Sequence, residues 1–196
     1  MRKLLWIAVV IFCSVASAVL SQEKQEAPGF SFIGTKGCKK CHLKQYKSWK
    51  DTKMAQAYEI LKPGERAEAK KKAGLDPAKD YTTDAKCLAC HTTGFGKPGG
   101  FVSFEKTPQL VGVSCEMCHG AGSEYTKKEH MSLKNKNYKL AEVVKVGLVS
   151  PVTGETCTTL CHNEKSPFYK KDEPFDFKKR KEQGTHKHFP LKYKHE

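Results

Sequence analysis

The chain has 196 residues, and its 35 Lys and Arg against 21 Asp and Glu give a formal charge of +14 at pH 7. Basic proteins often bind nucleic acid or membrane surfaces, but no recognised nucleic-acid-binding module accompanies the charge here, so no nucleic acid partner is expected. No Ser-His-Asp, paired-carboxylate or phosphate-loop pattern argues for hydrolysis or phosphoryl transfer.

Residues 1–18 predict a secretory signal peptide. Arg2 and Lys3 form the basic start, residues 4–15 the apolar core, and Ala16-Ser17-Ala18 an A-x-A cleavage site. The apolar stretch is short for a membrane span, although an uncleaved anchor is an alternative. We therefore expect a periplasmic or otherwise exported protein, with an extracellular location as the alternative, and no membrane span after cleavage.

Residues 19–36 predict a polar N-terminal linker, and residues 37–196 predict one folded domain. After His42 we expect a helix, because apolar residues recur every three to five positions and form one stripe. The stripe consists of Tyr46, Trp49, Met54, Tyr58 and Leu61.

Further along the chain, residues 65–73 predict a lysine-rich, solvated helix that ends at Gly74. Asp84 can cap a short helix entering Cys87. Residues 94–100 hold four glycines and a proline and predict a loop, and residues 101–104 predict at best one short strand.

Four cysteine pairs are each followed directly by a histidine. Three of them read C-x-x-C-H, and the fourth has one extra residue between its cysteines. C-x-x-C-H is the attachment signature of c-type haem, in which both thiols form thioethers and the histidine binds the iron. The sequence therefore predicts four covalently attached haems c. The cysteines are Cys38, Cys41, Cys87, Cys90, Cys115, Cys118, Cys157 and Cys161, and the histidines are His42, His91, His119 and His162.

Zinc sites and disulfides explain these pairs less well. A zinc ribbon pairs C-x-x-C units about 15 to 20 residues apart, whereas the gaps here are 45, 24 and 38 residues. Neither a ribbon nor a disulfide scaffold requires a histidine after every pair. In the fourth motif the extra residue must bulge outward, and attachment through Cys161 alone is the alternative.

The chain is short for four cofactors. After signal cleavage about 45 residues remain for each haem, too few for a conventional core and four separate pockets. We expect the porphyrins to form the core, with short helices and loops wrapped around them, and a haem-free chain to be unfolded or nearly so.

Four further histidines are available as second axial ligands. An iron with two strong ligands is an electron relay, whereas an iron with one ligand has an open position for a small molecule. Ligation is expected above all for His130 and His186, and the roles of His188 and His195 stay open.

Residues 37–130 resemble the tetrahaem cytochrome c-554 family, whose best-known members carry electrons away from hydroxylamine oxidoreductase. Past His130 the resemblance thins until His186-Lys187-His188. The segments between the haem motifs carry it, since C-x-x-C-H alone is found in any c-type cytochrome. They are residues 48–52, 61–63, 75–82, 94–96 and 112–120.

The resemblance implies an all-α, small multihaem fold with four closely packed haems. It also implies that His130 is the distal ligand of the first haem and His186 that of the fourth. The second haem, at His91, would be five-coordinate.

The third haem departs from the family pattern. The family's distal histidine lies two residues after the Asp-Thr pair, and that position here is Met54. Met54 either ligates the third iron through its thioether, which would raise the potential of that haem, or belongs to the apolar stripe. In the second case another histidine, such as His188 or His195, fills the site.

We expect an electron carrier between redox protein partners rather than an enzyme, with no catalytic residues assigned. The resemblance implies a hydroxylamine oxidoreductase-like donor. Two alternatives remain: a haem enzyme that reduces a small ligand such as nitric oxide at an open haem, and a subunit of a polymeric haem wire. The oligomeric state is not predicted.

Overall fold

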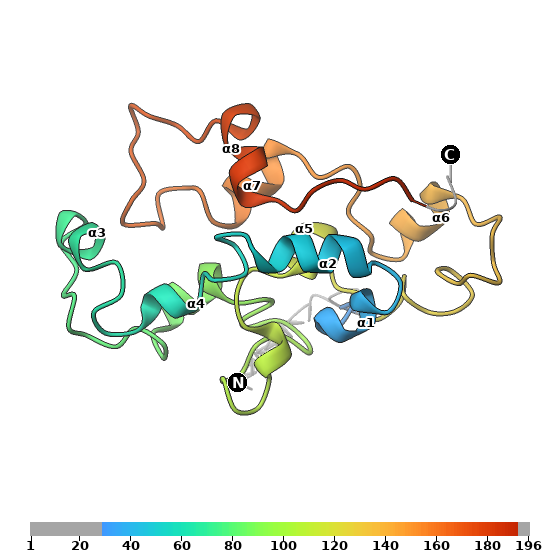
Figure 1. The fold of residues 1–196 in the computed structure, drawn as a ribbon, viewed down its shortest axis with the longest axis horizontal. Coiled ribbons are helices and arrows are strands. Elements are labelled where there is room, and N and C mark those ends of the chain that lie inside the picture. Colours follow the sequence, from blue (N-terminus) through green and yellow to red (C-terminus); the bar gives the residue numbers. More distant parts are fainter. Residues whose placement is uncertain (1–28, 192–196) are drawn as a thin grey trace, which may run out of the picture.

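The computed structural model describes residues 29–191, so the predicted signal peptide and His195 lie outside the described residues. The described chain folds into short helices joined by long loops (Figure 1). The α-helices are α1 (Thr35–Lys39), α2 (Leu43–Lys50), α3 (Ala67–Lys72), α4 (Ala85–His91), α5 (Cys115–His119), α6 (Leu140–Lys145), α7 (Gly154–Leu160) and α8 (Phe177–Gly184). Two 3₁₀ helices, η1 (Glu59–Leu61) and η2 (Pro108–Leu110), complete the set.

The fold class is all-α, as predicted. Within residues 29–191 the β structure is limited to one isolated antiparallel bridge between Thr92 and Val111, so the strand considered for residues 101–104 does not form. No helix in this part of the chain has the length and apolar character needed to cross a bilayer.

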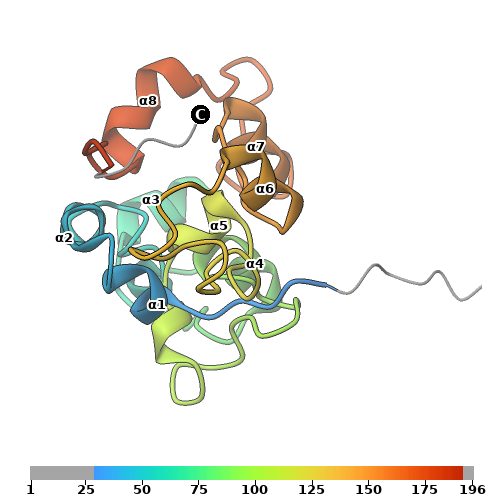
Figure 2. The same ribbon diagram turned by 90° about the vertical axis from the view of Figure 1, so that its right-hand side faces the viewer.

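The helices gather in two groups. Helices α1, α2 and α5 pack together near the middle of the molecule, and α7 packs on α8 above them (Figures 1 and 2). Helix α6 lies apart from this pair, at the right-hand end of the molecule in Figure 1.

The helix expected after His42 is shorter than predicted, because it stops at Lys50. The Thr52 hydroxyl donates to the carbonyl of Trp49 (2.7 Å) and accepts from the N–H of Ala55 (3.3 Å). These local bonds compete with the helical pattern, so the apolar stripe continues through turns and η1 instead of one continuous helix.

Helices α3 and α4 form where the sequence predicts them. Gly74, with φ of +71°, follows α3, and the Asp84 carboxylate caps α4 by accepting from the N–H of Lys86 (2.9 Å). The expectation of a fully solvated α3 is wrong at Lys70, which is buried and donates to the carbonyl of Lys62 (2.6 Å).

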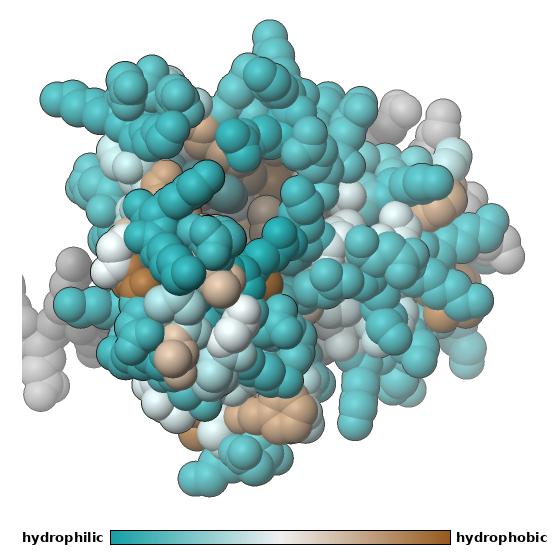
Figure 3. All heavy atoms as spheres, turned by 60° about the vertical axis from the view of Figure 1, so that its left-hand side comes forward, coloured by the Kyte–Doolittle hydropathy of each residue, from teal (hydrophilic) through white to brown (hydrophobic). Residues whose placement is uncertain are grey.

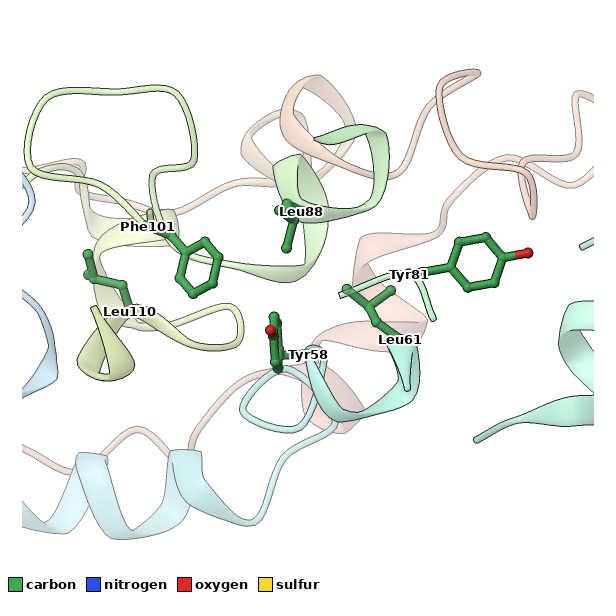
Figure 4. Packing of buried hydrophobic residues seen from close by; sticks show 6 residues of the cluster. All are labelled: Tyr58, Leu61, Tyr81, Leu88, Phe101 and Leu110. Atoms are coloured by element: carbon green, nitrogen blue, oxygen red, sulfur yellow. The ribbon is translucent and has the colours of Figure 1, made fainter. Parts of the chain in front are cut away.

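The hydrophobic core is small. Figure 4 shows Leu88, Phe101 and Leu110 facing Tyr58, and the cluster continues through Leu61 and Tyr81. Helices α2, α7 and α8 contribute no buried residue, and large apolar side chains such as Leu43 and Phe168 are exposed. Figure 3 shows a mostly hydrophilic face with a central hollow that holds hydrophobic atoms. The polypeptide therefore buries little apolar surface on itself.

The segment at residues 29–36, expected as the end of a linker, is packed against the fold. The N–H of Ser31 donates to Ser123 (3.0 Å), and that of Phe32 donates to the carbonyl of Pro98 (3.1 Å). The Glu116 carboxylate accepts the N–H groups of Ile33 and Gly34. These bonds begin the ordered packing before the first cysteine motif.

Candidate haem-attachment sites

Each cysteine motif lies on a short helix or at its end. Cys38 lies in α1, and His42 is the residue before α2; Cys87 to His91 lie in α4, and Cys115 to His119 span α5. In the first motif, the N–H groups of Cys41 (3.2 Å) and His42 (2.9 Å) donate to the carbonyl of Cys38. In such a turn Cys38, Cys41 and His42 occupy positions i, i+3 and i+4, which lie on the same face of the helix.

The fourth motif accommodates its extra residue in a wider turn. The N–H groups of Cys161 (3.1 Å) and His162 (3.0 Å) both donate to the carbonyl of Cys157. The bond from His162 therefore spans five residues where the first motif spans four. Leu160, next to Cys161, is 44% exposed. The wider turn thus absorbs the surplus residue, and the histidine keeps its backbone bond to the first cysteine. The outward bulge stays a prediction, because Leu160 lines a cavity next to α4 and α5.

The thiols of different motifs lie next to one another. All eight are free in the structure. Cys38 and Cys115 share a hydrogen bond that raises the pKa of Cys38 and lowers that of Cys115. A hydrogen bond to Cys161 lowers the pKa of Cys90 to about 7.

The third and fourth motifs are related by a charge interaction between their thiols. Burial, reinforced by the charge of Cys157, raises the pKa of Cys118 to about 11. The first motif therefore adjoins the third, the third adjoins the fourth, and the fourth adjoins the second. The four attachment sites form one continuous series.

The four motif histidines favour the neutral imidazole. Burial is the largest cause that lowers the pKa of His42, His91, His119 and His162. A neutral imidazole has the lone pair that binds a metal. The histidines are therefore held in the form that haem iron requires.

Backbone carbonyls orient two of these imidazoles. The Nδ1–H of His91 donates to the carbonyl of Ala57 (2.6 Å), and Nδ1 of His119 lies 3.4 Å from the carbonyl of Val149. Such a bond fixes the tautomer and leaves Nε2 for the metal. These carbonyl partners have no side-chain signature, so no pattern in the sequence could have identified them.

An aromatic ring supports the fourth motif. The His162 imidazole stacks on Phe175, with ring centroids 4.0 Å apart and planes inclined by 19°. An axial imidazole binds iron in its own plane, so stacking on its face leaves ligation unhindered.

Of the two histidines expected as distal ligands, His186 lies beside a motif histidine, and His130 lies in a turn. His186 lies beside His119, with ring centroids 6.3 Å apart, and His188 lies 5.0 Å from His186. The resemblance assigns His186 to the fourth haem, but the structure places it next to the proximal histidine of the third. His130 is half-buried at the end of a turn, where its N–H donates to the carbonyl of Lys127 (3.0 Å).

Met54 lies close to the third motif. Its carbonyl accepts the N–H of Val113 (2.9 Å), two residues before Cys115. Its side chain points to the end of α8, where a Cβ built on Gly184 would lie 3.2 Å from the Met54 methyl carbon. Position 54 therefore adjoins both the third motif and the segment that leads to His186.

Two cavities adjoin the motifs and have sizes in the range of small-molecule sites. One, of about 540 Å³, is lined by residues of α4, α5 and α7 together with Phe32 and Phe95. The other, of about 520 Å³, lies beside α1 and α2 and includes Lys36, Lys39 and Lys50. Apolar side chains dominate the first cavity, as a porphyrin face requires, and lysines near the second can pair with propionates.

The residues fit haem better than zinc. Within residues 29–191 no group of three or more Cys, His, Asp or Glu side chains could hold a metal ion, which a zinc ribbon would require. Free paired thiols, neutral imidazoles and apolar cavities beside them satisfy the needs of covalent haem attachment.

Comparisons with known proteins agree with this assignment. The family model described as cytochrome c554 and c-prime matches residues 37–120. The cytochrome c-554 of Nitrosomonas europaea is 46% identical over 120 residues, which are 60% of this chain and 51% of the relative. The aligned region thus spans about half the length of that relative.

A solved structure extends the similarity beyond the aligned region. The reduced state of cytochrome c554 from Nitrosomonas europaea superposes with a TM-score of 0.73 and 36% sequence identity, covering 84% of this chain and 88% of the other. The overall arrangement of the chain is therefore shared with that structure. The chain belongs to the cytochrome c554 family, and its cofactors are four covalently attached c-type haems.

Proposed function

We propose that the chain is a periplasmic electron carrier that accepts electrons from one redox protein and delivers them to another. The contiguity of the four attachment sites carries this proposal. Hydrogen bonds join Cys38 to Cys115 and Cys90 to Cys161, and the charge of Cys157 acts on Cys118, so each motif lies near another. Bound haem supplies reversible one-electron chemistry, and a continuous series of attachment sites suits transport through the molecule.

The polypeptide provides ligands, orientation and spacing for the cofactors. The neutral imidazoles are held for ligation, and the Ala57 and Val149 carbonyls set the orientation of His91 and His119. Helix α2, directly after the first motif, and helix α7 of the fourth motif have no buried residue, so their exposed sides are available for contact with porphyrin. These features serve binding and positioning, and no side chain is required to react.

The surface charge suggests an acidic partner. Without Arg2 and Lys3 the formal charge is +12, and eight haem propionates would lower the effective charge to roughly +4. The remaining basic charge can steer the carrier to acidic surfaces of redox proteins. The family membership favours a donor of the hydroxylamine oxidoreductase type.

Reduction of the mature holoprotein by such an enzyme tests the proposal. Hydroxylamine oxidoreductase supplied with hydroxylamine should reduce the haems, at a rate that falls as ionic strength rises. Replacing Lys36, just before the first motif, and Lys39, inside it, with Glu should slow reduction at low salt. The control is the equal charge change at Lys71 and Lys72, on α3, which lies away from α1 in Figure 1.

Two results would contradict this function. Haems that stay oxidised with hydroxylamine oxidoreductase, although dithionite reduces them, would exclude this donor. Haems that neither accept electrons from any protein donor nor pass them to a protein acceptor would exclude the carrier function itself.

A further inference from the structure

We infer that His186 is the second axial ligand of the third haem, opposite His119, and that it takes the place of a ligand from position 54. This assignment differs from the one implied by the family resemblance, in which His186 serves the fourth haem. The assignment rests on the proposed function, which requires four covalently attached haems. Its tests measure haem attachment and axial ligation separately, so a failure of either can be told from a failure of the other.

The spacing of the two imidazoles supports this ligand pair. A histidine nitrogen lies about 2 Å from the metal that it binds, so two imidazoles on opposite sides of one metal have centroids roughly 6 Å apart. The rings of His119 and His186 are 6.3 Å apart, with planes inclined by 31°. The rings of His186 and His188 are 5.0 Å apart, which is too close for opposite ligands of one iron.

The chain around His186 is fixed to α2. The N–H of Lys187 donates to the Ser48 hydroxyl (2.8 Å), and the Gln45 side chain donates to the carbonyl of Phe189 (3.5 Å). Ser48 and Gln45 both belong to α2, the helix that packs on α1 near α5. The C-terminal segment is therefore held where its imidazole reaches the third motif.

Met54 has a packing role in this arrangement. Its methyl group lies against Gly184, two residues before His186, and a side chain at position 184 would meet it at 3.2 Å. The absence of a side chain at Gly184 lets the end of α8 approach Met54 closely. The methionine thus supports the segment that carries His186, instead of reaching for the iron itself.

The fourth haem has different surroundings. The His162 ring stacks on Phe175 at 4.0 Å, and Arg180 of α8 is the charged group that acts on it. His186 lies beyond the end of the same helix and faces His119. With His186 bound at the third haem, the fourth haem must use another ligand or keep an open position.

The substitution His186→Gln tests the assignment in the mature holoprotein. We expect one haem to change from low-spin to high-spin, as read by electron paramagnetic resonance and the absorption spectrum. His188→Gln is the matched control from the same segment, and it should leave the spin states unchanged. An unchanged spectrum for His186→Gln, or a change only for His188→Gln, would overturn the inference.

A second substitution identifies which haem has lost its ligand. Position 54 lies beside the third motif, so adding Met54→His to His186→Gln should restore the low-spin state. If His186 instead served the haem at His162, a histidine at position 54 could not replace it and the high-spin signal would persist. The intact mass must correspond to four haems in each variant, which separates ligation from attachment.

If the His186 variant fails to fold, Met54→Leu tests whether the Met54 thioether binds the third iron. Leucine keeps the apolar contact with Gly184 and removes the thioether. We expect unchanged spin states and an unchanged redox titration, and no iron–thioether charge-transfer band in the unsubstituted protein. Such a band in the unsubstituted protein, or a high-spin haem in Met54→Leu, would identify Met54 as the second axial ligand of the third haem and overturn the inference.

Discussion

The Glu116 carboxylate accepts the backbone N–H of Gly34 at 2.7 Å, although 82 positions separate them in the sequence. The same carboxylate accepts the N–H of Ile33 (3.0 Å) and that of Gly122 (2.7 Å), and Glu116 is only 1% exposed. Glu116 is one of the two residues between the cysteines of the third motif. It therefore joins the segment before the first motif to the loop after the third.

Glu116→Ala should lower the free energy of unfolding of the ferric holoprotein by about 3 kcal/mol, since it leaves the buried N–H groups of Gly34 and Gly122 and the partly buried N–H of Ile33 without an acceptor. Glu116→Gln keeps one carbonyl oxygen and should cost about 1 kcal/mol. Guanidinium titrations followed by circular dichroism measure both values. Glu124→Ala, which removes an exposed partner of Lys127, serves as the control and should change stability little. Equal stability of all three variants would contradict the bridging role.

Lys70→Met should destabilise the protein by about 1 to 2 kcal/mol. The substitution keeps the aliphatic packing but removes the bond from Lys70 Nζ to the carbonyl of Lys62 and the contact of the ammonium group with the Tyr81 ring, 5.4 Å away. The adjacent Lys71 is exposed and pairs only with Glu68, so Lys71→Met is a matched control expected to be neutral. A denaturation midpoint shared by both variants would rule out a structural role for Lys70.

Gly120→Ala and Gly64→Ala separate backbone strain from crowding. Both glycines have positive φ, +81° and +77°, so alanine is strained at either position, and more strongly at Gly120, whose ψ of 164° lies in a region that is essentially limited to glycine. A Cβ on Gly120 would lie 2.2 Å from the carbonyl oxygen of Gly147, whereas nothing lies within 4 Å of one on Gly64. We expect Gly120→Ala to cost roughly 3 kcal/mol in total, measured by the same titration. Similar losses in the two variants would show that the loops after α5 move apart readily.

Deleting Leu160 should leave four haems attached. The shortened motif would read C-x-x-C-H, and its histidine would bond to the first cysteine as His42 does to Cys38. Intact mass measurement of the unaltered protein and the deletion variant should give four haems for both.

Cys157→Ser, made in the chain that keeps Leu160, tests whether Cys157 forms a thioether. Mass measurement after tryptic digestion would detect that bond. A three-haem mass for the unaltered protein would exclude attachment at the fourth motif.

A chain produced without haem attachment should be largely unfolded. The described residues bury only a small apolar cluster, and α2, α7 and α8 have no buried residue. Without porphyrin the apolar area removed from water cannot offset the conformational entropy of the chain. Far-ultraviolet circular dichroism of a variant with all eight motif cysteines replaced by serine checks this. A cooperative thermal transition in that variant would show that the polypeptide folds alone.

The sequence predicts the features that depend on local chemistry. The capping of α4 by Asp84 and the end of α3 at Gly74 follow from residue type and spacing, and the structure confirms them. The length of α2 could not be predicted from the apolar stripe, because the Thr52 hydroxyl bonds to the helix end instead of continuing it.

Contacts between segments that are far apart in the sequence could not be predicted from local sequence patterns. The carbonyl of Ala57 that orients His91, and the anchoring of Lys187 on Ser48, depend on backbone contacts between distant segments. Glu116 gave one weak signal, since an acidic residue inside a haem motif needs a partner, but the partners are amides of any residue type. The resemblance to relatives likewise gave no warning that His186 would lie beside His119.

The wide turn at the fourth motif bears on how haem proteins are counted in genomes. A search for strict C-x-x-C-H spacing would assign three haems to this chain, because Cys157 and Cys161 are one residue too far apart. In both the first and the fourth motif the histidine N–H donates to the carbonyl of the first cysteine, across four residues in one and five in the other. A definition based on that bond, rather than on the number of intervening residues, would recover the fourth cofactor.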